Sequence, residues 1–308
     1  MKGFVIVILL LVTVSVKAQQ IPLYSQYTFN RFALNPAYAG NKNRIESILT
    51  HRNHLVSFPG APTTQHISVS APIQAKYLGL GMRILNDQLG VSKQIAATFA
   101  ANYFIGFGGG RLAMGLEFGL HNYSMDWAAL DKKDDNDAVL PLSRQSVLVP
   151  DGGFGIFYNS EMFYGGYSVQ HMIRSKLYFE DVEYDRNAKL YMHHYLNFGG
   201  VFELNDLIQI EPHMLLKMVK AAPWQLDIGG YAVYKNMAGA GIAYRTGDAV
   251  YFTSKVEIKE QFYIGYSYGI RVNSLSTYSS NSHEVMVGYF YKLLEPARKK
   301  IIHPRYYF

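Results

Sequence analysis

The sequence predicts an all-β fold, a transmembrane antiparallel β-barrel of about 14 strands that follows an N-terminal signal peptide. Three observations support this prediction. Apolar residues alternate with small or polar residues along most of the chain, which indicates half-buried strands. Most of these stretches are about 8–13 residues long, near the ~9–11 residues with which a tilted strand crosses a bilayer. The long connections fall on one side of the predicted sheet, as in outer-membrane barrels.

The composition excludes several classes of protein. Of 308 residues, 49% are hydrophobic and 17% are charged, which excludes intrinsic disorder. The absence of cysteine excludes a disulfide scaffold, a thiolate metal site, a cysteine nucleophile and a lipid anchor on cysteine. The net charge of +6 is not gathered into a basic stripe, so no nucleic-acid partner is predicted. Beyond the N-terminus, no run of about 18 apolar residues occurs that would predict a spanning helix.

The first 18 residues have the pattern of a secretory signal peptide. Lys2 precedes an apolar run from Phe4 to Val16, and Val16-Lys17-Ala18 offers a small-residue cleavage site. An uncleaved anchor helix is the alternative, but this run is short for crossing a bilayer. The predicted organisation is a signal peptide at 1–18, a periplasmic N-terminal segment at 19–44, an outer-membrane barrel at 45–291 and a basic periplasmic tail at 292–308.

Alternation is clear from Phe262 to Arg271, where one face holds only Phe, Ile and Tyr and the other includes Gly, Ser and Arg. The stretch from Leu112 to His121 alternates in the same way, whereas the first and eighth predicted strands alternate least. The predicted strands are 45–52, 64–71, 78–87, 93–106, 111–123, 151–158, 162–169, 191–203, 207–217, 224–234, 238–245, 248–257, 261–271 and 283–291.

The connections between these strands are sorted by length. The long ones, all on one side, are 53–63, 124–150, 170–190 and 272–282. The short ones on the other side are 107–110, 159–161, 204–206, 235–237 and 258–260. A tight turn at Thr246-Gly247 also falls on the long-loop side. A soluble two-sheet sandwich is the alternative fold, but such a fold has no reason to sort its loops in this way.

The two faces of the strands predict what each contacts. The apolar face should meet outer-membrane lipid, and the small and charged face should line the lumen. Charged residues of both signs are expected in the lumen, where they can pair: Arg83, Glu117, Asp227, Arg245, Lys255, Glu257 and Arg271. Aromatic residues near strand ends are expected to form girdles at the membrane interfaces: Tyr103, Phe104, Tyr234, Tyr244, Tyr289 and Tyr291.

The segments that flank the barrel have their own signals. Asn35-Pro36 favours a turn, and Gly40-Asn41 can end it. Residues 24–40 are therefore expected to form a compact periplasmic segment that enters the first strand, or a plug across the periplasmic mouth of the lumen. An ordered arm without a binding role is the alternative. The tail from 292 contains Arg298-Lys299-Lys300, which could dock an acidic periplasmic partner or lie at the membrane interface.

Motifs that could carry chemistry favour other interpretations. Residues 265–269 match the G-x-S-x-G string of a hydrolase around Ser267, but they lie in an alternating strand, with no helix after it to form the required turn. The acidic stretch 131–137 lacks the spacing of a calcium loop. His193 and His194 are adjacent on a strand, so they point to opposite faces and cannot chelate one ion together. No catalytic residue, cofactor or metal site is predicted.

Two sequence blocks resemble a known family. Leu23 to Asn30 reads LYSQYTFN and Leu34 to Gly40 reads LNPAYAG, while HRN from His51 is followed by PGAPTTQ from Pro59. These blocks are similar to the conserved segments of the PorP/SprF family of the type IX secretion system of Bacteroidota. The resemblance implies an outer-membrane barrel without enzymatic activity. It also implies work with secretion or motility components in the periplasm, and some relatives hold a secreted adhesin, including those used in gliding, by its C-terminal domain.

The predicted function is therefore a non-enzymatic outer-membrane barrel that binds protein partners. The partners are a secreted adhesin, or its C-terminal domain, and periplasmic secretion or motility components. An outer-membrane pore or transporter for small or apolar solutes is the alternative, and it needs an open lumen. The predicted partner-binding residues are those of the shared motifs: Tyr24, Ser25, Gln26, Asn35, Pro36, Tyr38, Gly40, Arg52 and Pro62.

Overall fold

The computed structural model describes most of the barrel and the segment before it. The predicted signal peptide and almost all of the basic tail lie outside the described residues, as do the middle parts of the two longest loops. The described residues are 21–42, 44–56, 58–73, 77–130, 143–179, 188–220, 222–273 and 281–293. Among them, no helix is long and apolar enough to cross a membrane.

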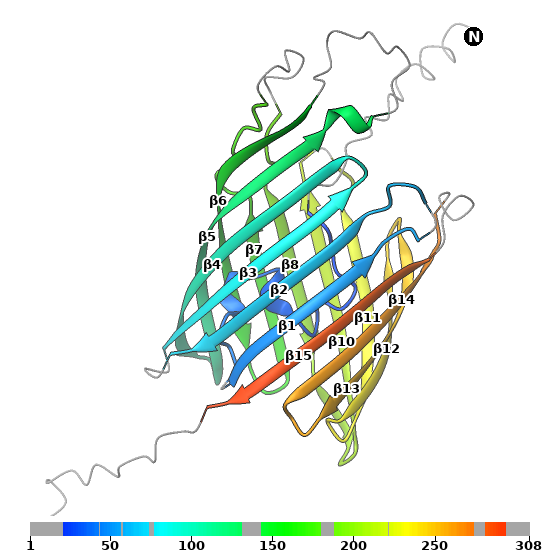
Figure 1. The fold of residues 1–308 in the computed structure, drawn as a ribbon. Coiled ribbons are helices and arrows are strands. Elements are labelled where there is room, and N and C mark those ends of the chain that lie inside the picture. Colours follow the sequence, from blue (N-terminus) through cyan, green and yellow to red (C-terminus); the bar gives the residue numbers. More distant parts are fainter. Residues whose placement is uncertain are drawn as a thin grey trace, which may run out of the picture.

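The described strands form one closed antiparallel barrel (Figure 1). Each strand pairs with the next along the chain, except that β8 and β9 both pair with β10, and β1 pairs with β15 to close the ring. The strands are β1 (Arg44–Asn53), β2 (Thr63–Pro72), β3 (Leu78–Leu89), β4 (Ser92–Phe107), β5 (Gly110–Asp126), β6 (Arg144–Asn159), β7 (Phe163–Gln170), β8 (His193–Gly200), β9 (Phe202–Asn205), β10 (Ile208–Val219), β11 (Gln225–Tyr234), β12 (Ala238–Arg245), β13 (Ala249–Ile258), β14 (Phe262–Arg271) and β15 (Ser282–Lys292).

Segments β8 and β9 form a single interrupted strand, because both pair with β10 and only Val201 separates them. Counting them as one leaves 15 − 1 = 14 strands. The prediction of an antiparallel barrel of about 14 strands is confirmed. The first and eighth predicted strands, which alternate least, are both present as β1 and β8.

The largest difference from the predicted strands lies in β6, which begins at Arg144 rather than at 151. The added stretch includes Pro150, and a proline cannot donate to a strand ladder. In the barrel, β7 pairs with β6 only from Phe154 onward, so Pro150 lies on an edge where no neighbouring strand needs its donor. The β5–β6 hairpin therefore extends beyond its neighbours at the end of the barrel that carries the long loops (Figure 1).

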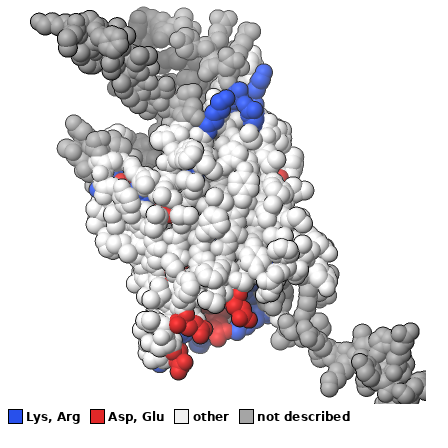
Figure 2. Space-filling model, turned by 180° about the vertical axis from the view of Figure 1, so that it is seen from behind, with Lys and Arg blue, Asp and Glu red and all other residues white. Residues whose placement is uncertain are grey.

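The barrel wall has an apolar outside and a polar inside. On β5, the outward side chains of Met114, Leu116, Phe118 and Leu120 are 42–66% exposed, as expected for lipid-facing positions. Figure 2 shows charged side chains gathered at the two ends of the barrel, with few on the wall between them. The charged residues predicted to line the lumen are all buried or partly buried.

One predicted girdle residue lies on the wrong face. Phe104 is buried in the lumen, where the Arg111 guanidinium lies over its ring, because the alternation of β4 points it inward. The other five predicted girdle residues are exposed on the outside. A position near a strand end therefore indicates a girdle only when the face is also correct.

Residues 21–42 occupy the lumen and are called the plug below (Figure 1). The plug contains two short 3₁₀ helices, η1 (Arg31–Ala33) and η2 (Pro36–Tyr38). Its start lies near the loops that follow β1 and β12, at the long-loop end, and its last residues lie near the start of β5, at the short-turn end. The described part of the predicted N-terminal segment 19–44 thus runs along the inside of the barrel before β1 begins.

Candidate functional site: the plug and the mouth above it

The first half of the plug is bound by a glutamate of the last strand. The backbone N–H groups of Ser25 and Gln26 donate to the Glu284 carboxylate at 2.8 and 2.9 Å. The Gln26 side chain donates in return to the Glu284 carbonyl at 3.1 Å. Glu284 is buried, and hydrogen bonds to an ionised carboxylate are among the stronger ones in proteins. The lumen wall therefore binds this half of the plug through its backbone.

Two arginines complete this attachment. Arg52 donates to the Leu23 carbonyl at 2.7 Å and to Glu284 at 3.2 Å. Arg245 donates to the carbonyls of Leu23 at 3.1 Å and of Tyr24 at 2.9 Å, while Asp227 balances its charge at 2.8 and 2.9 Å. We call Arg52, Arg245 and Glu284 the clasp. Its charges are paired, which burial requires.

Residues 35–40, in the second half of the plug, are bound by uncharged groups, whereas Arg83 and Arg111 donate to plug carbonyls on either side of them. Asn35 caps η2 by accepting from the Ala37 N–H at 2.9 Å, and Pro36 occupies the first helical position, as the local sequence favours. The Asn35 amide also donates to the Ile156 carbonyl on β6 at 3.0 Å. From β4, Asn102 donates to the carbonyls of Ala37 at 2.8 Å and Ala39 at 2.6 Å. These bonds satisfy backbone groups that the plug would otherwise bury unpaired.

Glycines of the wall make room for this second half. A Cβ at Gly115 or Gly155 would overlap the backbone of Ala37 or the side chain of Asn35. A Cβ at Gly81 would overlap the Phe32 ring in the same way. Phe32, Ala37 and neighbouring plug residues thus share one buried cluster with wall residues such as Phe157. The small residues on the inner face are a fitted surface for the plug.

The predicted partner-binding residues meet in this assembly. Gly40 has a φ of +63° beside the Ala71 carbonyl, a position suited to glycine. Pro62 is half-buried at the long-loop end. The rest are buried between plug and wall: Tyr24, Ser25, Gln26, Asn35, Pro36, Tyr38 and Arg52. Each buried residue contacts this chain's own barrel, and its contact with a partner stays a prediction.

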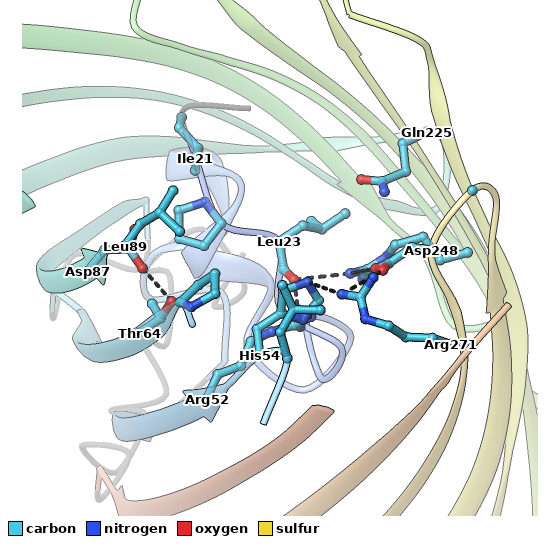
Figure 3. Close-up of a pocket in the computed structure, with 15 residues that line it drawn as sticks. Ile21, Leu23, Arg52, His54, Thr64, Asp87, Leu89, Gln225, Asp248 and Arg271 are labelled. Atoms are coloured by element: carbon cyan, nitrogen blue, oxygen red, sulfur yellow. Dashed lines mark hydrogen bonds and ion pairs between the residues drawn. The ribbon is translucent and has the colours of Figure 1, made fainter. Parts of the chain in front are cut away.

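Above the clasp lies a cavity of about 330 Å³ that opens at the long-loop end and that we call the mouth (Figure 3). Its floor is the start of the plug, Ile21 to Leu23, and its sides include Pro62 and Asp248. Asp248 forms ion pairs with Arg245 at 3.6 Å and Arg271 at 3.5 Å. The mouth thus combines charged and apolar lining residues, and Ile21, the first described residue of the plug, is one of them.

His54 is neutral at the mouth. Burial and the charge of Arg52, 2.9 Å away, lower its pKa to about 2. Arg271 lies 2.6 Å from the other ring nitrogen. Burial alone would raise the pKa of Asp248, but Arg245 and other cationic neighbours hold it at about 2. His54 and Asp248 therefore keep their charge states over the physiological range of pH.

Sequence reasoning missed the central role of Glu284. Glu284 is not among the predicted site residues, although its alternation with the apolar Val285 and Val287 could have placed it in the lumen. Ser267 of the G-x-S-x-G string lies in the middle of β14, where it is buried and accepts a hydrogen bond from Thr253 at 3.0 Å. It occupies a wall position rather than the turn of a hydrolase.

These features define a membrane β-barrel whose lumen contains its own N-terminal segment. Residues 16–289 match the family model described as type IX secretion system membrane protein PorP/SprF, and the chain belongs to this family. It is an outer-membrane protein of the type IX secretion system, and neither its family nor its fold is that of an enzyme class. Family membership implies contact with the membrane and with the secretion machinery.

Solved structures with a similar fold are outer-membrane barrels. The Ralstonia pickettii toluene transporter TbuX is 10% identical with a TM-score of 0.52, over 86% of this chain and 93% of that one. A Pseudomonas aeruginosa FadL homologue is 12% identical with a TM-score of 0.47, over 88% and 95%. At such identities the likeness concerns the fold alone. None of the curated proteins compared with the chain is similar to it.

Proposed function

We propose that this barrel holds, or helps to export, a secreted surface adhesin whose C-terminal domain binds at the long-loop end. At the other end the barrel would connect to periplasmic secretion or motility components. No chemical step is involved: the closed sheet anchors the chain in the membrane, and the loops and the mouth provide the binding surface. The family assignment supports the link to secretion.

The plug is the observation that favours binding over passage. It is bound at one half by the clasp and at the other by Asn102 and the wall glycines. A lumen occupied in this way is suited to a platform, with the mouth as a ready cavity above it. A partner that reached Tyr24 or Gln26 would first have to displace their contacts with the wall. Pro62, at the rim of the mouth, is the predicted residue that a partner can meet directly.

Deletion of the gene, followed by mass spectrometry of surface and medium proteins, tests the proposal. We expect one or more adhesins to leave the surface, either released to the medium or retained in the cell. A Pro62→Trp variant should weaken surface retention because the added ring fills the mouth. Met162→Trp, an exposed position on the β6–β7 turn, is the matched control. Unchanged location of every adhesin in the deletion strain would refute the proposal.

Passage of small or apolar solutes is the alternative function. The fold resembles that of a toluene transporter, but passage here would need the plug to move. Planar-bilayer recordings of the purified protein separate the two. We expect little steady current with the native plug, whereas large steady currents would favour a pore.

A further inference from the structure

A buried cluster in the lumen wall has the composition of a metal site. We propose that His121, Asp151 and His171 bind a divalent transition-metal ion of the zinc type. Each offers one ligand atom, and these atoms all lie within 4.8 Å of one another. The three residues come from β5, from β6 and from the residue that follows β7. Imidazole and carboxylate ligands in such a set are those that zinc prefers.

The distances need a modest adjustment to hold an ion, including an approach of the two histidines, whose ligand atoms lie within 4.8 Å of each other. His171 Nδ1 lies 2.6 Å from Asp151 Oδ2, and His121 Nε2 lies 3.7 Å from the same oxygen. A tetrahedral ion about 2.0 Å from each ligand needs neighbouring ligand atoms about 3.3 Å apart. The pair at 2.6 Å must open by roughly 0.7 Å, and the pair at 3.7 Å must close slightly. The hydrogen bond between His171 and Asp151 would be replaced by bonds from both residues to the ion.

Unpartnered atoms give a second and independent indication. Asp151 Oδ1 and His171 Nε2 have no hydrogen-bond partner in the described structure, although Asp151 is 4% exposed and His171 1%. Buried polar atoms without partners are uncommon and call for an explanation. Asp151 Oδ1 is thus available as a second carboxylate oxygen for the ion, whereas Nε2 of His171 points away from an ion bound at Nδ1. A small cavity of about 60 Å³ adjoins all three residues and leaves room for a water ligand.

Neighbouring residues could orient the ligands. The Gln94 side chain lies 3.4 Å from Nδ1 of His121 and, with its amide turned, can accept the proton of that nitrogen when Nε2 binds the ion. Arg83 pairs with Glu117 nearby, so its positive charge is already balanced. The ring of His193 packs edge-on against His171 and fixes its orientation. Such supporting contacts are typical of metal-binding histidines.

The position suggests what the ion would do. Over residues 144–153, β6 has no strand partner on its β7 side, and the chain after β7 runs beside it through the bond from Met172 N–H to the Gly152 carbonyl. An ion on His171, Asp151 and His121 would join this connection to the projecting β5–β6 hairpin. It would thereby stiffen the long-loop end beside the mouth, independently of what binds there.

Zinc titration of the purified, chelator-treated protein in detergent tests the proposal, with a purification tag other than polyhistidine. We expect a single tightly bound zinc ion per chain by elemental analysis and a rise in unfolding temperature. Cobalt should bind with the absorption bands of a tetrahedral N/O site. Because protons compete for the same atoms, affinity should fall as the pH decreases.

Variants locate the ion. Asp151→Asn and His171→Gln should each weaken zinc binding by at least roughly 10-fold. His194→Gln is the matched control, because His194 lies next to His193 on β8 but outside the lumen, where it contacts Tyr167. Heat-modifiable gel mobility checks that each barrel has folded. Absence of binding in the wild-type protein, or equal binding by the Asp151→Asn, His171→Gln and wild-type proteins, would overturn the proposal and leave a hydrogen-bonded histidine–aspartate pair only.

Discussion

The two halves of the plug are bound in different ways. The clasp binds residues 23–26 through charged hydrogen bonds to their backbone at the long-loop end. Residues 35–40 are bound by the neutral Asn102 and by close packing against wall glycines. A competing charged or backbone group can replace the first kind of contact, whereas the second depends on shape and has no simple competitor. The half beneath the mouth is thus the half that a partner could release.

Single thiols can report on each half, because the chain has no cysteine of its own. Thr28 and Ala37 are both buried, one in each half of the plug. Maleimide labelling of Thr28→Cys or Ala37→Cys then measures how often that half leaves the wall. Unfolding by urea in detergent measures the stability of the barrel in the same variants.

Loss of Arg245 should have the largest effect. Arg245→Leu leaves Asp227 buried without a partner and removes two bonds to the plug, which costs about 3–5 kcal/mol of stability. Labelling at position 28 should rise much more than at position 37. Adding Asp227→Leu should restore much of the barrel's stability but not the protection of position 28. Equal labelling changes at both positions would show that the plug is bound as one unit.

A methyl group on the wall should act on the other half. Gly155→Ala would place its Cβ against the Asn35 side chain, and overpacking of this kind costs about 1–3 kcal/mol. Labelling at position 37 should rise while position 28 stays protected. Gly106→Ala on β4 is the control, because its added methyl meets open space. If both alanine variants label alike, the glycines do not fit the plug.

Loss of Asn102 should also release the second half of the plug and not the first, and it adds no atoms to the wall. Asn102→Ala leaves the carbonyls of Ala37 and Ala39 without this donor, at a cost of about 1–3 kcal/mol. The urea midpoint of unfolding should fall, and labelling at position 37 should rise. Asn86→Ala is the control. The Asn86 amide donates only to the Gln65 side chain near the surface, so this change should alter the free energy of unfolding by less than about 0.5 kcal/mol.

Lowering the pH should weaken the ion pairs of the mouth only slightly, and only in strong acid. The lowered pKa of Asp248, about 2, means that its ion pairs with Arg245 and Arg271 stabilise the fold above its ordinary pKa of 3.8. This stability, about 2 kcal/mol at most, is lost as the pH falls from about 4 towards 2. Unfolding midpoints measured over that range should fall less in Asp248→Asn than in the wild type. Parallel curves would mean that Asp248 is not linked to folding.

Much of the barrel could be predicted because strand patterning is local. Alternation along about ten residues shows which face meets lipid, whichever strand lies beside it. The strand ends lie where this alternation stops, and most of the predicted ends agree with the structure to within two residues. The predicted start of β6, at 151, was wrong: the strand runs through Pro150, and a sheet tolerates proline only at an edge. Edges depend on the lengths of neighbouring strands, which no local pattern contains.

The proposed metal site could not be predicted from local patterns either, because its residues come from different strands. Asp151 pairs with Gly119 in the β5–β6 ladder, which places His121 two residues along the same face. That register depends on the early start of β6, which the sequence does not indicate. His171 lies just after β7 and has a left-handed backbone, with φ of +58°, which the sequence does not indicate either. No spacing pattern therefore brings the three residues together in advance.

By itself the sequence determined a closed barrel with an apolar exterior, a charged lumen and long loops at one end, because each follows from alternation and loop length. Only the tertiary structure decided that the N-terminal motif lies inside the lumen. Ser25 and Gln26 meet Glu284 across 259 and 258 residues. That contact exists only because β1 and β15 close the ring, which brings the start and the end of the chain together.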